Sequence, residues 1–202
     1  MSKPYHALPS HRLHPQTSCH HYNQGLPEKV GLDNPATDAM TDLKRVKAIT
    51  VDPSTPIDIA LQKMIHAEVR LLLVTNDSGS ILGLITARDI MGEKPINHAA
   101  RARIPHEAIL VEHIMTPSEQ IQVLRMGDVL RASLGDIILT LKEANRQHAL
   151  VVEPAGEGIT AGNEIVRGIF STTQIGKQLG VEIQPTGKVQ NFAELEALLG
   201  KT

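Results

Sequence analysis

Residues 83–89, Gly-Leu-Ile-Thr-Ala-Arg-Asp, and residues 168–174, Gly-Ile-Phe-Ser-Thr-Thr-Gln, decide how the chain is organised. Each segment begins with a glycine, continues with two apolar residues and reaches a hydroxyl residue, Thr86 or Ser171. Ser and Thr are preferred at the first position of a helix, so each segment predicts a β-strand that runs directly into a helix. Two such junctions in one chain indicate an internal repeat.

The sequence before each junction repeats as well. A Met-Thr pair opens each copy, at Met40 and at Met115. Apolar residues at helical spacing follow, first Ile57, Ala60, Leu61 and Met64, and 77 residues later Leu134, Ile137, Ile138 and Leu141. A short apolar strand comes next in each copy, at residues 71–74 and 149–152, and then a turn. The order strand, helix, strand, hairpin, strand, helix therefore occurs twice.

Neither copy is large enough to bury its own sheet. We therefore predict an α/β (α+β) fold of two pseudo-symmetric repeats, each a small three-stranded sheet with two helices, packed sheet to sheet. The predicted divisions are an irregular N-terminal arm (1–36), the first repeat (37–95), a linker with a helical stretch near 106–113 (96–111), the second repeat (112–182) and a C-terminal tail with a short amphipathic helix (183–202).

Composition excludes several classes of function. The 20 Lys and Arg residues against 22 Asp and Glu give a net charge of −2, which disfavours a phosphate-neutralising surface for nucleic acid. Aromatic residues make up only 2% of the chain, so bases have few rings to stack on. No apolar run approaches the roughly 18–20 residues of a membrane span, and the start of the chain lacks a secretory signal. We expect a cytoplasmic protein that binds neither nucleic acid nor membrane.

The duplicated pattern resembles a pair of CBS domains, named after cystathionine β-synthase and often called a Bateman module. The resemblance covers roughly residues 38–180, and only Gln174 departs from it, because the family usually has Asp there. It implies a stand-alone regulatory module without catalytic activity or a required cofactor. It further implies an adenine nucleotide (AMP, ADP or ATP, less often S-adenosylmethionine or NAD(H)) bound between the repeats, a homodimeric disc of four CBS units, and an unknown regulated protein.

The first junction has side chains that suit a nucleotide. A helix start offers free amides and a positive dipole end to a phosphate, to which Thr86 adds a hydroxyl donor and Arg88 a positive charge. Asp89 only accepts hydrogen bonds, so both hydroxyls of a ribose could donate to it. In similar modules the other copy closes the cleft, and carrying its positions over to this chain gives Gly127, Gln147 and His148.

The same carry-over places a second cleft at the other junction. It would contain Ser171 and Gln174 and be faced by Ile49, Val69 and Arg70. Gln174 supplies no negative charge, so we predict tighter binding at the Asp89 cleft. A plainer interpretation remains open, in which Thr86 and Asp89 only cap a helix, His148 contacts no ligand and Arg70 is a solvated charge.

Three other functions compete with nucleotide sensing. The first is metal binding by the arm through His6, His11, His14, Cys19, His20 and His21, although their spacing matches no structural zinc pattern and a polar arm without a ligand explains them as well. The second is a protein-interaction or dimerisation scaffold with vestigial nucleotide clefts. A hydrolase is disfavoured, because Asp58 and Asp136 suit helix starts and no Walker loop or catalytic triad is visible. We therefore predict no catalytic residues and no metal site.

Overall fold

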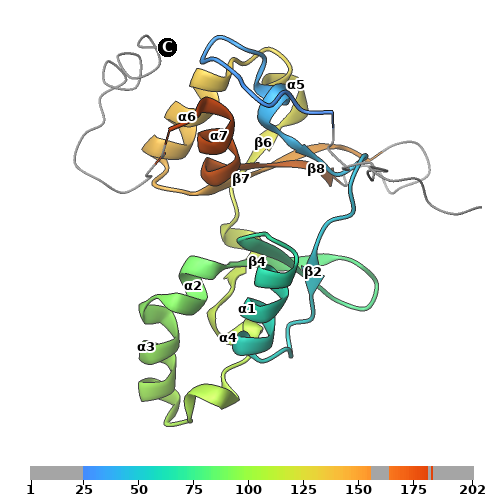
Figure 1. The fold of residues 1–202 in the computed structure, drawn as a ribbon. Helices are drawn as coiled ribbons and strands as arrows, with labels where there is room; N and C mark the ends of the chain where they lie inside the picture. The colour runs from blue at the N-terminus through green and yellow to red at the C-terminus, as the bar shows by residue number, and fades with distance from the viewer. Residues whose placement is uncertain (1–24, 156–163, 182, 184–202) are drawn as a thin grey trace, which may run out of the picture.

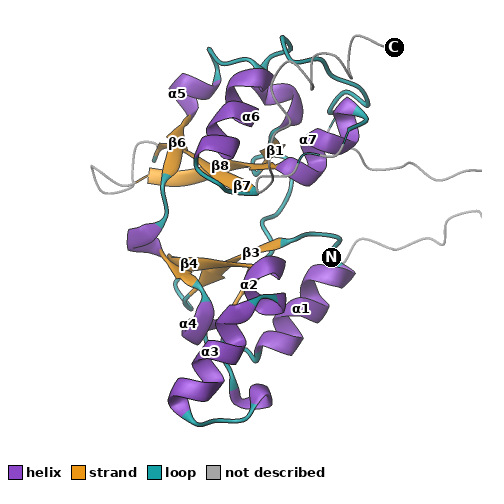
Figure 2. Ribbon diagram, turned by 90° about the vertical axis from the view of Figure 1, so that its left-hand side faces the viewer, coloured by secondary structure: helices purple, strands orange, loops and turns teal. Residues whose placement is uncertain are grey.

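The computed structural model describes residues 25–155, 164–181 and 183, and these residues form two halves whose sheets face each other (Figures 1 and 2). The helices lie on the outer faces, so the layers run helix, sheet, sheet, helix (Figure 2). The candidate metal ligands of the arm and the amphipathic stripe predicted near the C-terminus lie outside the described residues. Within the described part, no helix is long and apolar enough to cross a membrane.

The first half contains a four-stranded sheet of order β2-β3-β4-β5. Its strands are β2 (Thr50–Val51), β3 (Leu71–Thr75), β4 (Ile81–Thr86) and β5 (Thr116–Pro117). The apolar stripe of α1 (Ile57–His66) packs on this sheet together with α2 (Ala87–Met91) and α4 (Val111–Ile114). Ile57, Met64, Leu72 and Ile85 are almost completely buried in this core, as the two sequence periods require.

The second half repeats this arrangement with the order β1-β8-β7-β6. Its strands are β1 (Thr41–Asp42), β6 (Val123–Arg125), β7 (His148–Pro154) and β8 (Glu164–Ser171). Three helices accompany them, α5 (Met126–Val129), α6 (Leu134–Glu143) and α7 (Thr172–Leu179), and a 3-10 turn at Ala36–Ala39 completes the core around Phe170. The α/β fold of two pseudo-symmetric halves is therefore confirmed.

A third apolar cluster joins the two sheets. Leu71 and Leu73 of β3 are buried with Leu150 of β7, and Leu84 and Ile169 pack against them. These residues point away from the helices, because alternate residues of a strand face opposite sides of its sheet. The two halves therefore share one apolar seam, as the sheet-to-sheet prediction requires.

Each sheet has four strands rather than the predicted three. The fourth is the short strand that contains the Thr of each Met-Thr pair, Thr41–Asp42 or Thr116–Pro117, which we call the lead strand of its copy. Each lead strand pairs with the sheet of the other copy. Thr41 lies opposite Ile169 in β8, and Thr116 lies opposite Leu84 in β4. The glycines of the two junctions allow this approach: a Cβ at Gly83 would lie 2.5 Å from the Thr116 carbonyl oxygen, and one at Gly168 would lie 2.5 Å from the Met40 sulfur. The two motifs of the repeat are thus in direct contact.

The stretch expected as a linker is largely helical. A ten-residue helix, α3 (Glu93–Ala102), follows α2, and a 3-10 turn (His106–Ala108) and α4 lead into the second copy. Pro95 lies in the first turn of α3, where its missing N–H has no intrahelical partner to lose, so proline does not interrupt this helix.

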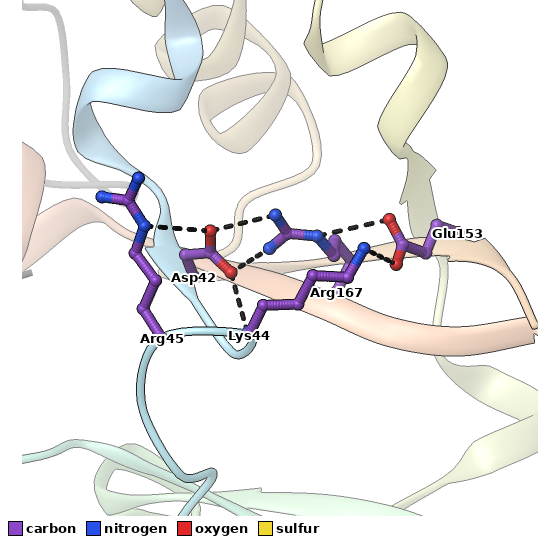
Figure 3. Close-up of polar contacts among 5 residues, drawn as sticks. All are labelled: Asp42, Lys44, Arg45, Glu153 and Arg167. Atoms are coloured by element: carbon purple, nitrogen blue, oxygen red, sulfur yellow. Dashed lines mark hydrogen bonds and ion pairs between the residues drawn. The ribbon is translucent and has the colours of Figure 1, made fainter.

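An ion-pair network holds the first lead against the second sheet (Figure 3). The Arg167 guanidinium donates to both carboxylate oxygens of Asp42 and also pairs with Glu153, Nε to Oε2 at 3.2 Å. Lys44 Nζ lies 2.6 Å from Glu153 Oε1, and Arg45 Nε lies 3.8 Å from Asp42 Oδ2. Burial raises the pKa of the Asp42 carboxyl, but the bonds from Arg167 and the Lys44 amide, with the nearby positive charges, outweigh it and lower the pKa.

Gly83→Ala is expected to destabilise the protein more than Gly168→Ala. At Gly83 the new methyl group meets the backbone of β5, which can move only by opening the sheet, whereas at Gly168 it meets the flexible side chain of Met40. Overpacking of this kind costs about 1–3 kcal/mol, so Gly83→Ala belongs at the upper end of that range. Urea denaturation of both variants measures the difference, and equal losses would contradict this account of the lead strands.

Arg167→Met is expected to lower the free energy of unfolding by about 2 kcal/mol, because it leaves two largely buried carboxylates without their shared cation. Arg131→Met is the matched control, since Arg131 pairs with Asp128 at the surface, where ion pairs contribute less than about 1 kcal/mol. Chemical denaturation of both variants gives the comparison, and an effect at Arg167 no larger than at Arg131 would show that the network contributes little.

Candidate functional site

A cavity of about 360 Å³ lies between the halves at the start of α2. Thr86, Arg88 and Asp89 form its polar wall on the side of the first copy, and leucines of β3, β4 and β7 form an apolar wall. Residues of the second copy complete the lining, namely Thr116, Gln120, Ile121, Gln122, Asn145, Arg146, Gln147 and His148. The cavity therefore combines an apolar slot with charged and hydrogen-bonding groups, as small-molecule sites do.

Five of the six residues predicted for the first cleft line this cavity: Thr86, Arg88, Asp89, Gln147 and His148. Gly127 does not line it and is exposed in α5. The structure places Gln122 where Gly127 was expected. Thr50 pairs with Leu73 in the first sheet as Val123 pairs with Leu150 in the second, so Val123 is the equivalent of Thr50, 73 positions later. The equivalent helices α1 and α6 begin 77 positions apart. The four-residue helix α5 accounts for the shift.

Thr86 and Asp89 form a capping box at the start of α2. The Asp89 amide donates to Thr86 Oγ1 at 3.2 Å, while Asp89 Oδ2 accepts from the Thr86 amide at 2.9 Å and from Thr86 Oγ1 at 2.7 Å. Thr86 and Asp89 therefore do cap a helix, as the plainer interpretation of these two residues holds. It coexists with their position on the cavity wall, since a carboxylate offers about four acceptor positions.

The other oxygen of Asp89 has a partner that the sequence did not reveal. Lys94 Nζ, from the first turn of α3, lies 2.6 Å from Asp89 Oδ1 and donates at 3.2 Å to the Ile114 carbonyl oxygen. Three donors thus occupy Asp89, and one acceptor position remains. No motif places residue 94 near residue 89, because the contact depends on how α3 turns away from α2.

His148 is neutral near pH 7. Burial, followed by the positive charge of Arg70, lowers its pKa to about 4, and the negative charge of Asp89 opposes this only in part. The imidazole therefore faces the cavity as a hydrogen-bonding group rather than as a cation. The positive charge available to a phosphate on this wall comes from arginine side chains, Arg88 and Arg146.

The residues predicted for the second cleft lie apart from this cavity. Ile49 and Val69 pack against the core of the first half, and Arg70 is exposed. Ser171 begins α7 without a side-chain capping bond, and Gln174 stands where the first copy has Asp89. The strand register also corrects the equivalences: Leu71 pairs with Thr86 as His148 pairs with Ser171, so Leu71 matches His148 and Arg70 matches Gln147. Val69 was therefore one residue out of register.

The described residues contain no group of three or more His, Cys, Asp or Glu side chains arranged to hold a metal ion. The polar groups gathered at the cavity are hydroxyl, carboxylate, amide, guanidinium and neutral imidazole groups. They suit an organic ligand that carries both hydroxyl and anionic groups.

Comparison with known proteins identifies the repeat. Residues 36–95 match the family model of the CBS domain. This segment is a CBS domain. The second copy has the same strand order and the same exchanged lead strand, so it repeats the fold of the first. No curated protein matches the sequence.

Several solved structures are similar to this chain. An uncharacterized conserved protein from Pyrococcus horikoshii has 26% identity and a TM-score of 0.50, over 72% of this chain and 92% of its own. A CBS-domain containing protein from Agrobacterium tumefaciens shares the fold at 19% identity and a TM-score of 0.51, over 79% of this chain and 98% of its own. A CBS-pair protein from Arabidopsis thaliana, solved in complex with AMP, has 22% identity and a TM-score of 0.46, over 70% and 93% of the two chains.

His148→Leu, which introduces the residue found at the equivalent position of the first copy, is expected to reduce the loss of stability at acidic pH. A histidine with a pKa of about 4 in the folded state takes up its proton near pH 6.5 in the unfolded chain, so acidification from pH 6.5 to 4 favours unfolding by up to about 3 kcal/mol. Urea denaturation between pH 4 and 7 measures this slope, with exposed His66→Leu as the control. An unchanged slope in His148→Leu would contradict the assignment.

Proposed function

We propose that the cavity binds an adenine nucleotide and that the protein is a regulatory sensor rather than an enzyme. The observation that carries the proposal is the convergence of Thr86, Arg88 and Asp89 from one CBS repeat with Gln147 and His148 from the other. A ligand in this position contacts both repeats at once. It therefore stabilises one relative arrangement of the halves, which a partner can recognise.

The chemistry of the wall fits the parts of a nucleotide. The leucines give an aliphatic slot for the base. Asp89 can accept from ribose hydroxyls, because one of its acceptor positions is free and another is held only by the exchangeable contact with Lys94. Arg88 lies beside the helix start, where it can pair with a phosphate. A volume of about 360 Å³ is at the small end of the range for ligand sites, about 300–1,000 Å³. Arg88 and Arg146 favour the phosphates of AMP, ADP or ATP over S-adenosylmethionine, which has none, and the small volume disfavours the larger NAD(H).

We further propose that the protein acts as a homodimer on another protein. Apolar side chains are exposed on the outer helices of the first half, with Ile65 of α1 67% exposed and Met91 of α2 70% exposed. The alternative function is a scaffold whose clefts no longer bind nucleotide. The capping box favours that alternative, because it gives Thr86 and Asp89 a structural role that needs no ligand.

Asp89→Ala is expected to weaken binding of AMP, ADP or ATP by about 10- to 100-fold in calorimetry, because the ribose loses its charged acceptor. Asp136→Ala is the matched control: Asp136 forms the same capping box with Ser133 at the start of α6 but does not line the cavity. Both variants lose a similar cap contribution, about 1 kcal/mol. Asp89→Ala also loses the Lys94 ion pair, so the two variants are compared by their nucleotide affinity and not by their stability.

The same nucleotides, with S-adenosylmethionine and NADH for comparison, are screened by thermal shift on the full chain. A ligand at 100 times its dissociation constant stabilises by about 2.7 kcal/mol and raises the melting temperature by a few degrees. Equal affinity in the Asp89→Ala and Asp136→Ala variants would place the ligand elsewhere. No shift with any compound would favour the scaffold.

A further inference from the structure

A second, larger groove lies beside the cleft, between α3 and α4, two helices that run next to each other in Figure 2. Its volume is about 880 Å³. Lys94, His98 and Arg101 of α3 line one wall at a spacing of four and three residues, which places them on one face of the helix. His113 lies on the opposite wall. None of the residues lining this groove is acidic, so its charge is positive.

The charged side chains of the groove, Lys94 and Arg101, are hydrogen-bond donors only. Arg101 forms no ion pair with any residue in the described part of the chain. The rings of His98 and His113 stack with their centroids 4.5 Å apart. The Leu110 amide donates to His113 Nδ1 at 3.0 Å, so the proton of the neutral ring is on Nε2, where it can be donated. Guanidinium, ammonium and imidazole donors around one space favour a phosphate oxyanion.

Lys94 connects the groove with the cleft. Its ammonium lines the groove while it pairs with Asp89 Oδ1, and Asp89 lines the cleft. Gln120 lines both cavities. The two spaces therefore meet at the Asp89–Lys94 ion pair.

We propose that this groove is a phosphate-binding site and that it is coupled to the nucleotide cleft through Lys94. The coupling follows from the acceptors of Asp89. Oδ2 is fully used by the two bonds from Thr86, so two ribose hydroxyls must both use Oδ1 and thereby displace Lys94. The displaced Lys94 ammonium then lies in the groove, where it pairs with a phosphate.

The coupling is reciprocal. A phosphate that holds Lys94 in the groove removes the competitor of the ribose from Asp89, and a ribose on Asp89 releases the cation that the phosphate needs. The phosphate can be a free anion or the distal part of a nucleotide in the cleft. Phosphate binding in the groove does not depend on what the cleft binds, whereas the coupling rests on the proposed function of the cleft.

The experiment titrates the full chain with inorganic phosphate alone, and then with adenosine in the absence and presence of saturating phosphate. Phosphate alone is expected to bind, and Arg101→Gln is expected to weaken it at least 5-fold, while Lys63→Gln, which removes an exposed lysine of α1, has no effect. Phosphate is expected to tighten adenosine binding at least 5-fold. Lys94→Met is expected to abolish this enhancement while adenosine still binds. The affinity for ATP is then measured with and without phosphate. If phosphate no longer tightens binding, the groove holds the distal phosphate of the nucleotide, and if it still does, the groove holds a free anion.

Each part of the proposal can fail separately. If phosphate binds equally well to the wild type and Arg101→Gln, the groove is not its site. If the enhancement is lost in Arg88→Gln and kept in Lys94→Met, the phosphate lies in the cleft and the groove proposal is wrong. If phosphate binds as expected but adenosine does not bind, the groove stands and the nucleotide function of the cleft fails.

Discussion

The close approach of each Met-Thr lead to the glycine of the other copy is the constraint on which the structure depends. The Thr116 carbonyl oxygen and the Met40 sulfur occupy the space that a side chain at Gly83 or Gly168 would fill. Because each sheet takes its fourth strand from the other copy, neither half completes its edge alone, and the two halves are tied together at two places. This crossing also holds β5 beside β4, so that Thr116 faces the same cavity as Thr86.

The two crossings share a backbone geometry but differ in their side chains. The first lead is held by the charged contacts of Asp42 with Arg167, and in the second lead the position of Asp42 is taken by Pro117, which faces Gly83. The two junctions also differ in a charged side chain, since Gln174 occupies the position in the second copy that Asp89 occupies in the first. Both copies keep what the pairing needs, namely the glycines and the short lead strands. The two copies therefore share a backbone arrangement but differ in the side chains at their junctions.

The repeat was predictable because its signals are local: a glycine, a hydroxyl cap, and apolar stripes of known period. The exchange of the leads was not, since a short strand pattern does not identify the strand it pairs with. Gly127 was misplaced because a four-residue helix shifts the register between β6 and α6 without changing the apolar stripes on either side. Lys94 was missed for a different reason. Its contact with Asp89 depends on the angle at Gly92, which no periodicity encodes.

Asp89 performs two tasks, one with each carboxylate oxygen: Oδ2 accepts from Thr86 and Oδ1 pairs with Lys94. As a cap it needs the Thr86 donors, and as a largely buried anion, with its side chain only 14% exposed, it needs a cation when the cleft is empty. Ligand binding in the proposed function is therefore an exchange at Oδ1, in which hydroxyls replace an ammonium. The contact given up is one that fastens α3 to α2, so an exchange inside the cleft changes how an outer helix is held. A sensor needs such a link, because a partner contacts the surface and not the cavity.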